Sequence, residues 1–125
     1  MELTIHTDRE RQVIDITDEV QKLVSSDNSS VTVFAAHTTC AVTTADLDPG
    51  AGEDLAAAIW EMVPKLDYSR HHNPAHMPAH IASSVVGPSV IIPVRTGKLV
   101  LGTWQRVILI ELDGPRERKL VVSVL

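Results

Sequence analysis

The sequence predicts an α+β domain with a largely antiparallel β-sheet core and two or three helices. Three observations favour this fold class: β-rich runs outnumber helical patterns, short turns join neighbouring runs, and the last third of the chain is almost wholly β-rich. The chain has 125 residues, of which 44% are hydrophobic and 22% charged. These values are typical of one globular domain, here residues 1–125, with a proper hydrophobic core.

The N-terminal third predicts two strands, a short helix and two further strands. Residues 2–7 and 11–16 alternate apolar and polar side chains, and the polar turn between them suggests that they pair as antiparallel neighbours. The acidic residues that follow Thr17 are typical of the first turn of a helix. Two β-rich runs come next, at residues 31–36 and 40–45.

The rest of the chain predicts two helices and a series of strands. An amphipathic helix over residues 52–63 ends at Pro64, and the histidine-rich loop 67–80 runs into a short helix that begins at Pro78 and ends near Val86. Pro93 cannot donate to a β-ladder, so we expect it at a sheet edge or bulge. The strands predicted in this part are 90–94, 98–102, 103–112 and 118–125.

Composition excludes several classes of function. The net charge of −5 and the lack of a Lys/Arg block argue against a nucleic-acid partner. No P-loop, GxGxxG or GxSxG motif is present, so we expect no nucleotide cofactor and no α/β-hydrolase mechanism. The single cysteine, Cys40, cannot form an internal disulfide, and its place within a strand predicts a buried apolar residue.

The sequence also indicates a cellular compartment. No apolar stretch approaches the roughly 20 residues that a membrane span needs. The N-terminus has neither the basic region nor the apolar region of a secretory signal. We therefore expect a cytoplasmic protein without membrane contact.

Histidine is the residue type that most strongly indicates a functional site. His71, His72, His76 and His80 fall within ten residues, and a fifth, His37, ends an apolar run. Imidazole is the commonest metal ligand in proteins and titrates near neutral pH. The four-residue spacing of His76 and His80 suits two ligands on one helical face, although Pro78 favours a helix that starts after His76.

Several motifs together resemble the YjbQ family. They are HTTCAVTT, MPAHI at 77–81, LGTWQ at 101–105 and a downstream DGPR, and the similarity runs from about residue 12 to the C-terminus. The resemblance implies a compact α+β homotrimer whose motif residues build a polar pocket. It also implies a secondary thiamine-phosphate synthase activity, which joins a pyrimidine diphosphate to a thiazole phosphate.

The resemblance extends to individual residues. It favours His37, His71, His76 and His80 as ligands of a divalent metal such as zinc. Where many members have an INEN-type segment, this chain has the shorter TTADLDP, and Asp46 is the nearest equivalent of the family carboxylate. The resemblance therefore implies catalytic roles for His37, Asp46, His80 and Gln105, and substrate contacts for Thr38, Trp104, Gln105 and Arg116.

Each of these residues also has a structural interpretation. His37 could be hydrogen-bonded to backbone inside the fold, His72 fits a solvated loop, and Trp104 fits a core strand position. Arg116 could bind a phosphate, or pair on the surface with Asp113 or Glu117.

Three functions remain open from sequence. The first is a YjbQ-like enzyme that acts on a small phosphorylated metabolite, either by thiamine-phosphate formation or by metal-dependent phosphoester hydrolysis. The second is a non-enzymatic trimer that binds a metal or an anionic metabolite. In the third, the histidines only cap helices and join subunits. The long apolar strands of the C-terminal third support an oligomer independently, because two or three helices cannot cover both faces of such a sheet.

Overall fold

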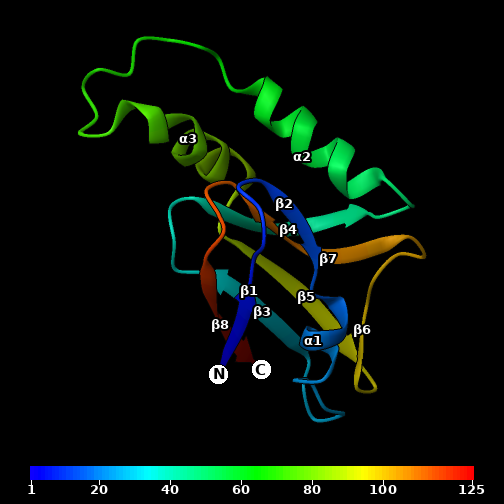
Figure 1. Ribbon diagram of the computed structural model, residues 1–125. Helices are drawn as coiled ribbons and strands as arrows, with labels where there is room; N and C mark the ends of the chain where they lie inside the picture. The colour runs from blue at the N-terminus through cyan, green and yellow to red at the C-terminus, as the bar shows by residue number, and fades with distance from the viewer.

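The computed structural model describes residues 1–125 and has three layers: a pair of helices, a small sheet and a larger sheet (Figure 1). The elements in chain order are β1 (Glu2–His6), β2 (Gln12–Asp15), α1 (Thr17–Gln21), β3 (Ser30–Ala35), β4 (Cys40–Asp46), α2 (Ala51–Met62), the 3₁₀ turn η1 (Pro74–His76), α3 (Met77–Val86), β5 (Ser89–Arg95), β6 (Lys98–Leu99), β7 (Gln105–Glu111) and β8 (Glu117–Val124). None of the helices is long and apolar enough to cross a membrane.

The strands form two sheets in place of the single sheet that the sequence suggested. Five strands are arranged in the order β1-β8-β3-β5-β6, and three in the order β2-β7-β4. Every pair is antiparallel. The α+β class and the antiparallel pairing are thus confirmed.

Strand β7 is buried on both faces and separates two apolar cores. Val107 and Leu109 point into the core between the sheets, whereas Ile108 and Ile110 point into the core beneath α2 and α3. All four side chains are fully buried. An uninterrupted apolar run is what a strand with two buried faces requires, because successive side chains point to opposite sides.

The predicted N-terminal hairpin is wrong. Strand β1 pairs with β8 in the larger sheet, and β2 pairs with β7 in the smaller one. Residues 7–11 therefore cross from one sheet to the other instead of turning back. Residues 112–116 make the same crossing beside them, with the Thr7 N–H donating to the Arg116 carbonyl (2.9 Å) and the Gly114 N–H to the Glu10 carbonyl (2.9 Å). A Cβ at Gly114 would overlap the Arg9 carbonyl oxygen, so this crossing requires glycine.

Two predictions for the β-rich third also change. The run predicted over 98–102 is a strand only at Lys98–Leu99, and Trp104 stands in the turn before β7 with 71% of its surface exposed. The interpretation of Trp104 as a core residue is therefore wrong, because β7 starts one residue later. Pro93 lies in β5 opposite Ser30 of β3, one residue before the two that pair with the edge strand β6, and its carbonyl accepts from the Val100 N–H (2.9 Å). It therefore stands in the strand next to the sheet edge and not in the edge strand itself.

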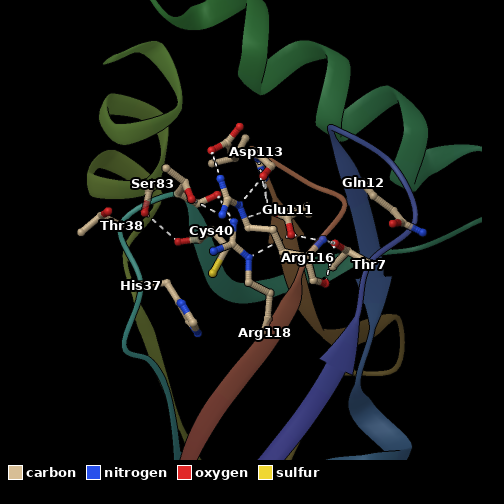
Figure 2. Close-up of polar contacts among 12 residues, drawn as sticks. Thr7, Gln12, His37, Thr38, Cys40, Ser83, Glu111, Asp113, Arg116 and Arg118 are labelled. Atoms are coloured by element: carbon tan, nitrogen blue, oxygen red, sulfur yellow. Dashed lines mark hydrogen bonds and ion pairs between the residues drawn. The ribbon is translucent and has the colours of Figure 1, made fainter. Parts of the chain in front are cut away.

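A buried ion pair joins the two sheets next to these crossings (Figure 2). Glu111 ends β7 and is 0% exposed, and Arg118 in β8 is 3% exposed. The Arg118 guanidinium donates through Nε to Glu111 Oε1 (2.9 Å) and through a terminal nitrogen to Oε2. Thr7 Oγ1 donates to Oε1 (2.8 Å), and the Leu112 N–H donates to Oε2 (3.0 Å). Both oxygens of the carboxylate are thus satisfied.

The same guanidinium also fixes the segment in front of β4. Its terminal nitrogen donates to the Thr39 carbonyl (3.0 Å) and to Thr39 Oγ1 (2.9 Å). Burial alone would raise the pKa of Glu111, but the hydrogen bonds from Arg118 and Thr7 outweigh it and hold that pKa below its ordinary value. The pair is therefore ionised at neutral pH.

Removal of one charge from this pair should destabilise the fold strongly. Glu111→Gln would leave the Arg118 charge buried without a counterion, so we expect the free energy of unfolding to fall by about 3–5 kcal/mol. Urea denaturation followed by circular dichroism measures it. The matched control is Glu117→Gln, whose carboxylate is exposed and lies 3.9 Å from the Lys119 ammonium. The control should change the free energy by less than about 1 kcal/mol. Equal effects of the two substitutions would contradict this role of the pair.

Candidate functional site

A polar groove of about 390 Å³ lies where α3 meets the segment between β3 and β4. Figure 2 shows three of its residues, His37 and Thr38 from that segment and Ser83 from α3. The lining residues are His37, Thr38, His80, Ser83, Ser84 and Pro88. The groove thus combines two imidazoles with three hydroxyl groups and contains no carboxylate.

His80 has the most defined chemistry of these residues. It lies in the first turns of α3, which begins at Met77 with Pro78 in its opening turn, as the sequence predicted to within one residue. Its Nδ1 lies 3.0 Å from the Thr38 carbonyl oxygen. A carbonyl only accepts hydrogen bonds, so Nδ1 carries the proton and Nε2 keeps its lone pair in the neutral ring. The ring is therefore oriented as a base, a metal ligand or, once protonated, an anion donor.

His37 is held by the backbone of β8. Its Nε2 lies 3.0 Å from the Lys119 carbonyl oxygen and 3.2 Å from the Lys119 nitrogen. Strand β3 ends at Ala35, which pairs with Leu120, so the imidazole replaces the backbone partner that Lys119 would otherwise lack. The structural interpretation of His37 thus holds in part: Nε2 is occupied by backbone, and Nδ1 is the nitrogen left for a ligand.

The loop histidines separate into two groups. The His71 ring lies 5.1 Å from the His80 ring and 4.3 Å from the His72 ring, measured between centroids. His71 Nδ1 lies 2.8 Å from the Asn73 carbonyl oxygen and 2.9 Å from the Asn73 nitrogen, so this ring nitrogen is occupied by backbone and Nε2 is left for other contacts. His76 precedes α3, as Pro78 predicted, and its Nδ1 lies 3.7 Å from an Asp113 carboxylate oxygen.

The other predicted site residues lie away from the groove. Asp46 ends β4 and accepts a hydrogen bond from the Asp48 N–H (3.1 Å). Gln105, which pairs with Asp46 across the sheet, donates to Thr44 Oγ1 (2.9 Å). Arg116 takes the surface pairing that the sequence left open, because its guanidinium donates to an Asp113 carboxylate oxygen (2.7 Å). Trp104 lies beside Gln105 in the exposed turn.

One chain does not supply a complete set of metal ligands. No group of three or more His, Cys, Asp or Glu side chains is arranged to hold a metal ion. Within the predicted set of His37, His71, His76 and His80, only His71 and His80 have rings in mutual contact. A catalytic zinc takes three protein ligands, so these two imidazoles fit only part of such a site.

The largest surface cavity, about 570 Å³, lies elsewhere, between β2 and the first turns of α2. Two of its three carboxylates are countered by cations from neighbouring elements, with Arg9 lying 3.8 Å from Glu53 and Arg106 lying 2.7 Å from Asp15, whereas Asp48 forms no ion pair. The hydrogen bonds from Thr17 and Arg106 lower the pKa of Asp15 against the effect of burial. The smaller groove is the stronger candidate site because it gathers imidazoles and hydroxyls.

Cys40 starts β4 next to the groove, where its carbonyl accepts from Ser83, and its thiol is buried. Burial raises the pKa of its thiol to about 11, because the thiolate would lose its hydration. This agrees with the prediction of a buried apolar cysteine and leaves it no nucleophilic role at neutral pH.

Sequence reasoning missed Ser83, Ser84 and the positioning role of Arg118. The two serines follow His80 at three and four residues, the spacing that shares one helical face, so this pattern could have identified them. No local signal identified Arg118. It acts on Thr39, which is 79 residues distant in sequence, and thereby on the segment that carries His37 and Thr38.

The full length of the chain, residues 1–125, matches the family model described as UPF0047 protein YjbQ-like. The chain belongs to this family. It is 39% identical to a UPF0047 protein of Archaeoglobus fulgidus over all of both chains, and 32% identical to UPF0047 protein YugU of Bacillus subtilis over 98% of this chain and 96% of that one.

Solved structures of YjbQ-like proteins have the same fold. An uncharacterized conserved protein of the YjbQ/UPF0047 family from Clostridium acetobutylicum superposes with a TM-score of 0.89 at 35% identity, covering 100% of this chain and 99% of that one. A hypothetical protein of Aeropyrum pernix K1 gives a TM-score of 0.87 at 35% identity, with 100% and 96% coverage. The comparisons thus establish the family and the fold, and the names of these relatives state no reaction.

The hydrogen bond to Thr38 makes a direct prediction about His80. In ¹⁵N-resolved NMR spectra of the histidine side chains recorded at alkaline pH, His80 should be the Nδ1–H tautomer. His6 is exposed on β1 and has no side-chain hydrogen bond, so it should show the Nε2–H form that is usual in solution and serves as internal control. An Nε2–H tautomer at His80 would contradict the described site.

Proposed function

We propose that this YjbQ-family chain is an enzyme that acts on a small phosphorylated metabolite bound in the His37–His80 groove. The observation that supports this proposal best is the orientation of His80, whose Nδ1 is engaged by the Thr38 carbonyl and whose Nε2 is left free. A side chain fixed in this way needs no reorganisation when it meets a substrate.

The chemistry of the lining favours an anionic ligand. The hydroxyls of Thr38 and Ser84 can donate to phosphate oxygens, and a protonated imidazole adds a charge-assisted hydrogen bond. No carboxylate lines the groove to repel a phosphate. Ser83 contributes less, because its hydroxyl already donates to the Cys40 carbonyl (2.6 Å).

A divalent metal such as zinc remains part of the proposal. His71 and His80 would hold it, and its further ligands would come from the substrate or from outside this chain. When bound, such an ion would polarise a phosphate oxygen. Without it, the same imidazoles would contact the phosphate directly.

The finer proposal is thiamine-phosphate formation, which the family resemblance supports. In that reaction the thiazole nitrogen forms a bond to the methylene carbon of the pyrimidine, the bond from that carbon to oxygen breaks, and pyrophosphate departs with the electron pair. The attacking nitrogen carries no proton to remove, so the reaction needs charge stabilisation of pyrophosphate more than a general base. A groove of imidazoles and hydroxyls without a catalytic triad suits this demand. Hydrolysis of a phosphoester is the other enzymatic form, and it would require His80 Nε2 to activate water.

A homotrimer in the cytoplasm completes the proposal. The outer face of the larger sheet has no helix over it (Figure 1) and exposes Phe34, Ile91 and Val121, of which Phe34 and Val121 are cross-strand neighbours. An apolar sheet face of this kind favours association with further copies.

Binding of pyrophosphate tests the site. Isothermal titration calorimetry of the untagged protein should show binding that weakens about tenfold or more in His80→Ala, because a charge-assisted hydrogen bond is lost. His6→Ala is the matched control, since His6 is exposed on β1, and it should leave the affinity unchanged. Equal affinity in wild-type protein and His80→Ala would remove the groove from the proposal.

The reaction is tested with the same proteins. Wild-type protein incubated with the pyrimidine diphosphate and the thiazole phosphate should release thiamine phosphate, measured by chromatography, and His80→Ala should not. Pyrophosphate binding without any product would favour the non-enzymatic anion-binding function instead. Elemental analysis of the same preparation gives the metal content per chain.

A further inference from the structure

The two edges of the smaller sheet differ. In the order β2-β7-β4, strands β2 and β4 each have a neighbour on one side only. The outer edge of β4 is covered, because the Val42 N–H donates to the carbonyl of Gly87 at the end of α3 (3.1 Å). Strand β2 has no such cover, and the largest cavity of the molecule lies along it. An uncovered edge is a template on which another strand can pair.

The pairing register identifies the free backbone groups of β2. The Ile16 N–H donates to the Val107 carbonyl (2.9 Å), and these residues stand opposite each other when the β2–β7 register is continued. Bonded and non-bonded pairs alternate along antiparallel strands, so Ile14 is bonded to β7, whereas Val13 and Asp15 turn their N–H and C=O groups outward. Neither residue makes a backbone hydrogen bond with another element. Their donors and acceptors are therefore available at the edge.

Helix α2 lies over β2 and runs in the opposite direction (Figure 1). A Cβ on Gly52 would lie 3.5 Å from the Val13 Cβ, and the Arg11 guanidinium carbon lies 4.2 Å from the centroid of the Trp60 ring. Later residues of the helix thus lie over earlier residues of the strand. The start of α2 consequently lies toward Asp15.

Charged side chains make the two ends of this edge different. Arg11, Val13 and Asp15 line the cavity, and as alternate residues they share one face, so they present a cation, an apolar side chain and an anion in that order. Arg11 pairs only with its neighbour Glu10 (3.2 Å). Asp48, which lines the cavity just before α2, forms no ion pair and adds to the acidic end. Charges on an edge oppose indiscriminate pairing and favour a strand with the complementary order.

We infer that β2 is a docking edge for an extended peptide segment of a partner protein, which adds as an antiparallel strand beside the start of α2. Its basic residue would stand opposite Asp15, its apolar residue opposite Val13 and its acidic residue opposite Arg11, so the segment reads basic-x-apolar-x-acidic from N to C. Backbone hydrogen bonds supply affinity in this mode, and alternate side chains supply specificity. The cavity shares no lining residue with the His37–His80 groove, so the inference is independent of the proposed function.

A synthetic peptide tests the docking edge. The probe is acetyl-TKTVTET-amide, whose lysine, valine and glutamate match Asp15, Val13 and Arg11 in antiparallel register. Isothermal titration calorimetry should show binding that weakens about tenfold or more when the valine nitrogen is methylated, because that N–H donates to the Val13 carbonyl. Methylation of the next threonine nitrogen is the matched control, since that N–H points away from β2, and it should leave the affinity unchanged. The charge-reversed peptide acetyl-TETVTKT-amide should bind more weakly.

Amide hydrogen exchange measured by NMR locates the contact on the protein. Without peptide, the Val13 and Asp15 amides should exchange quickly and the Ile14 amide slowly, because only Ile14 is bonded to β7. Saturation with acetyl-TKTVTET-amide should slow exchange at Val13 and Asp15 about tenfold or more. Val13→Pro removes one outward donor without breaking the β2–β7 ladder, so this variant should fold and lose the peptide.

Three results would overturn the inference. The first is no binding of the probe peptide at about 1 mM. The second is equal loss of affinity, or none, from the two methylated peptides, since strand addition requires only one of the two N–H groups. The third is slow exchange at Val13 and Asp15 in the protein alone, which would show that a second copy of the chain already covers the edge.

Discussion

The buried pair of Glu111 and Arg118 is the interaction on which the rest of the structure depends. It joins β7 of the smaller sheet to β8 of the larger one at the point where two chain segments cross between the sheets. Such a pair is costly to bury. It is stable here because both carboxylate oxygens and one terminal nitrogen of the guanidinium have further partners, with Thr7 on the side of Glu111 and Thr39 on the side of Arg118. The desolvation cost of the pair is thus incurred at the point where the two sheets are joined.

The geometry of the candidate site depends on this ion pair. Arg118 holds Thr39, the next residue Thr38 offers its carbonyl to His80, and the imidazole is left with one free nitrogen in the groove. His37 is fixed independently by Lys119 of the same strand that carries Arg118. A site on a loop is therefore positioned as firmly as one on a strand, which is the condition for preorganised binding.

Much of the fold could be predicted from the sequence, since its signals are local. The uninterrupted apolar run of β7, the proline that opens α3 and the glycine of the DGPR connection each indicate the element that they form. The pairing of β1 with β8 could not be predicted, because a two-sheet crossing and a hairpin both need a polar connection of the same length. Trp104 was misplaced for a related reason: an apolar neighbourhood in sequence does not reveal that β7 begins one residue later.

The site was predictable only in part. Residue type and the family motifs identified His80 and His37, and helical spacing explains Ser83 and Ser84. Asp46 and Gln105 carry the same motif signal but lie about 20 Å away, because β4 separates them. The positioning role of Arg118 could not be predicted, because a basic residue in a C-terminal strand does not indicate a partner 79 residues earlier in the sequence.

The most direct test of this account is the tautomer of His80 in an Arg118→Lys variant, read from side-chain ¹⁵N NMR spectra. Lysine keeps the charge beside Glu111 but cannot donate to the carboxylate and to Thr39 in the same fork geometry. We predict that His80 loses its single Nδ1–H tautomer and exchanges between forms, while the resonances of the exposed His6 stay unchanged. An unaltered His80 in a folded variant would contradict the claim that the buried pair positions the site.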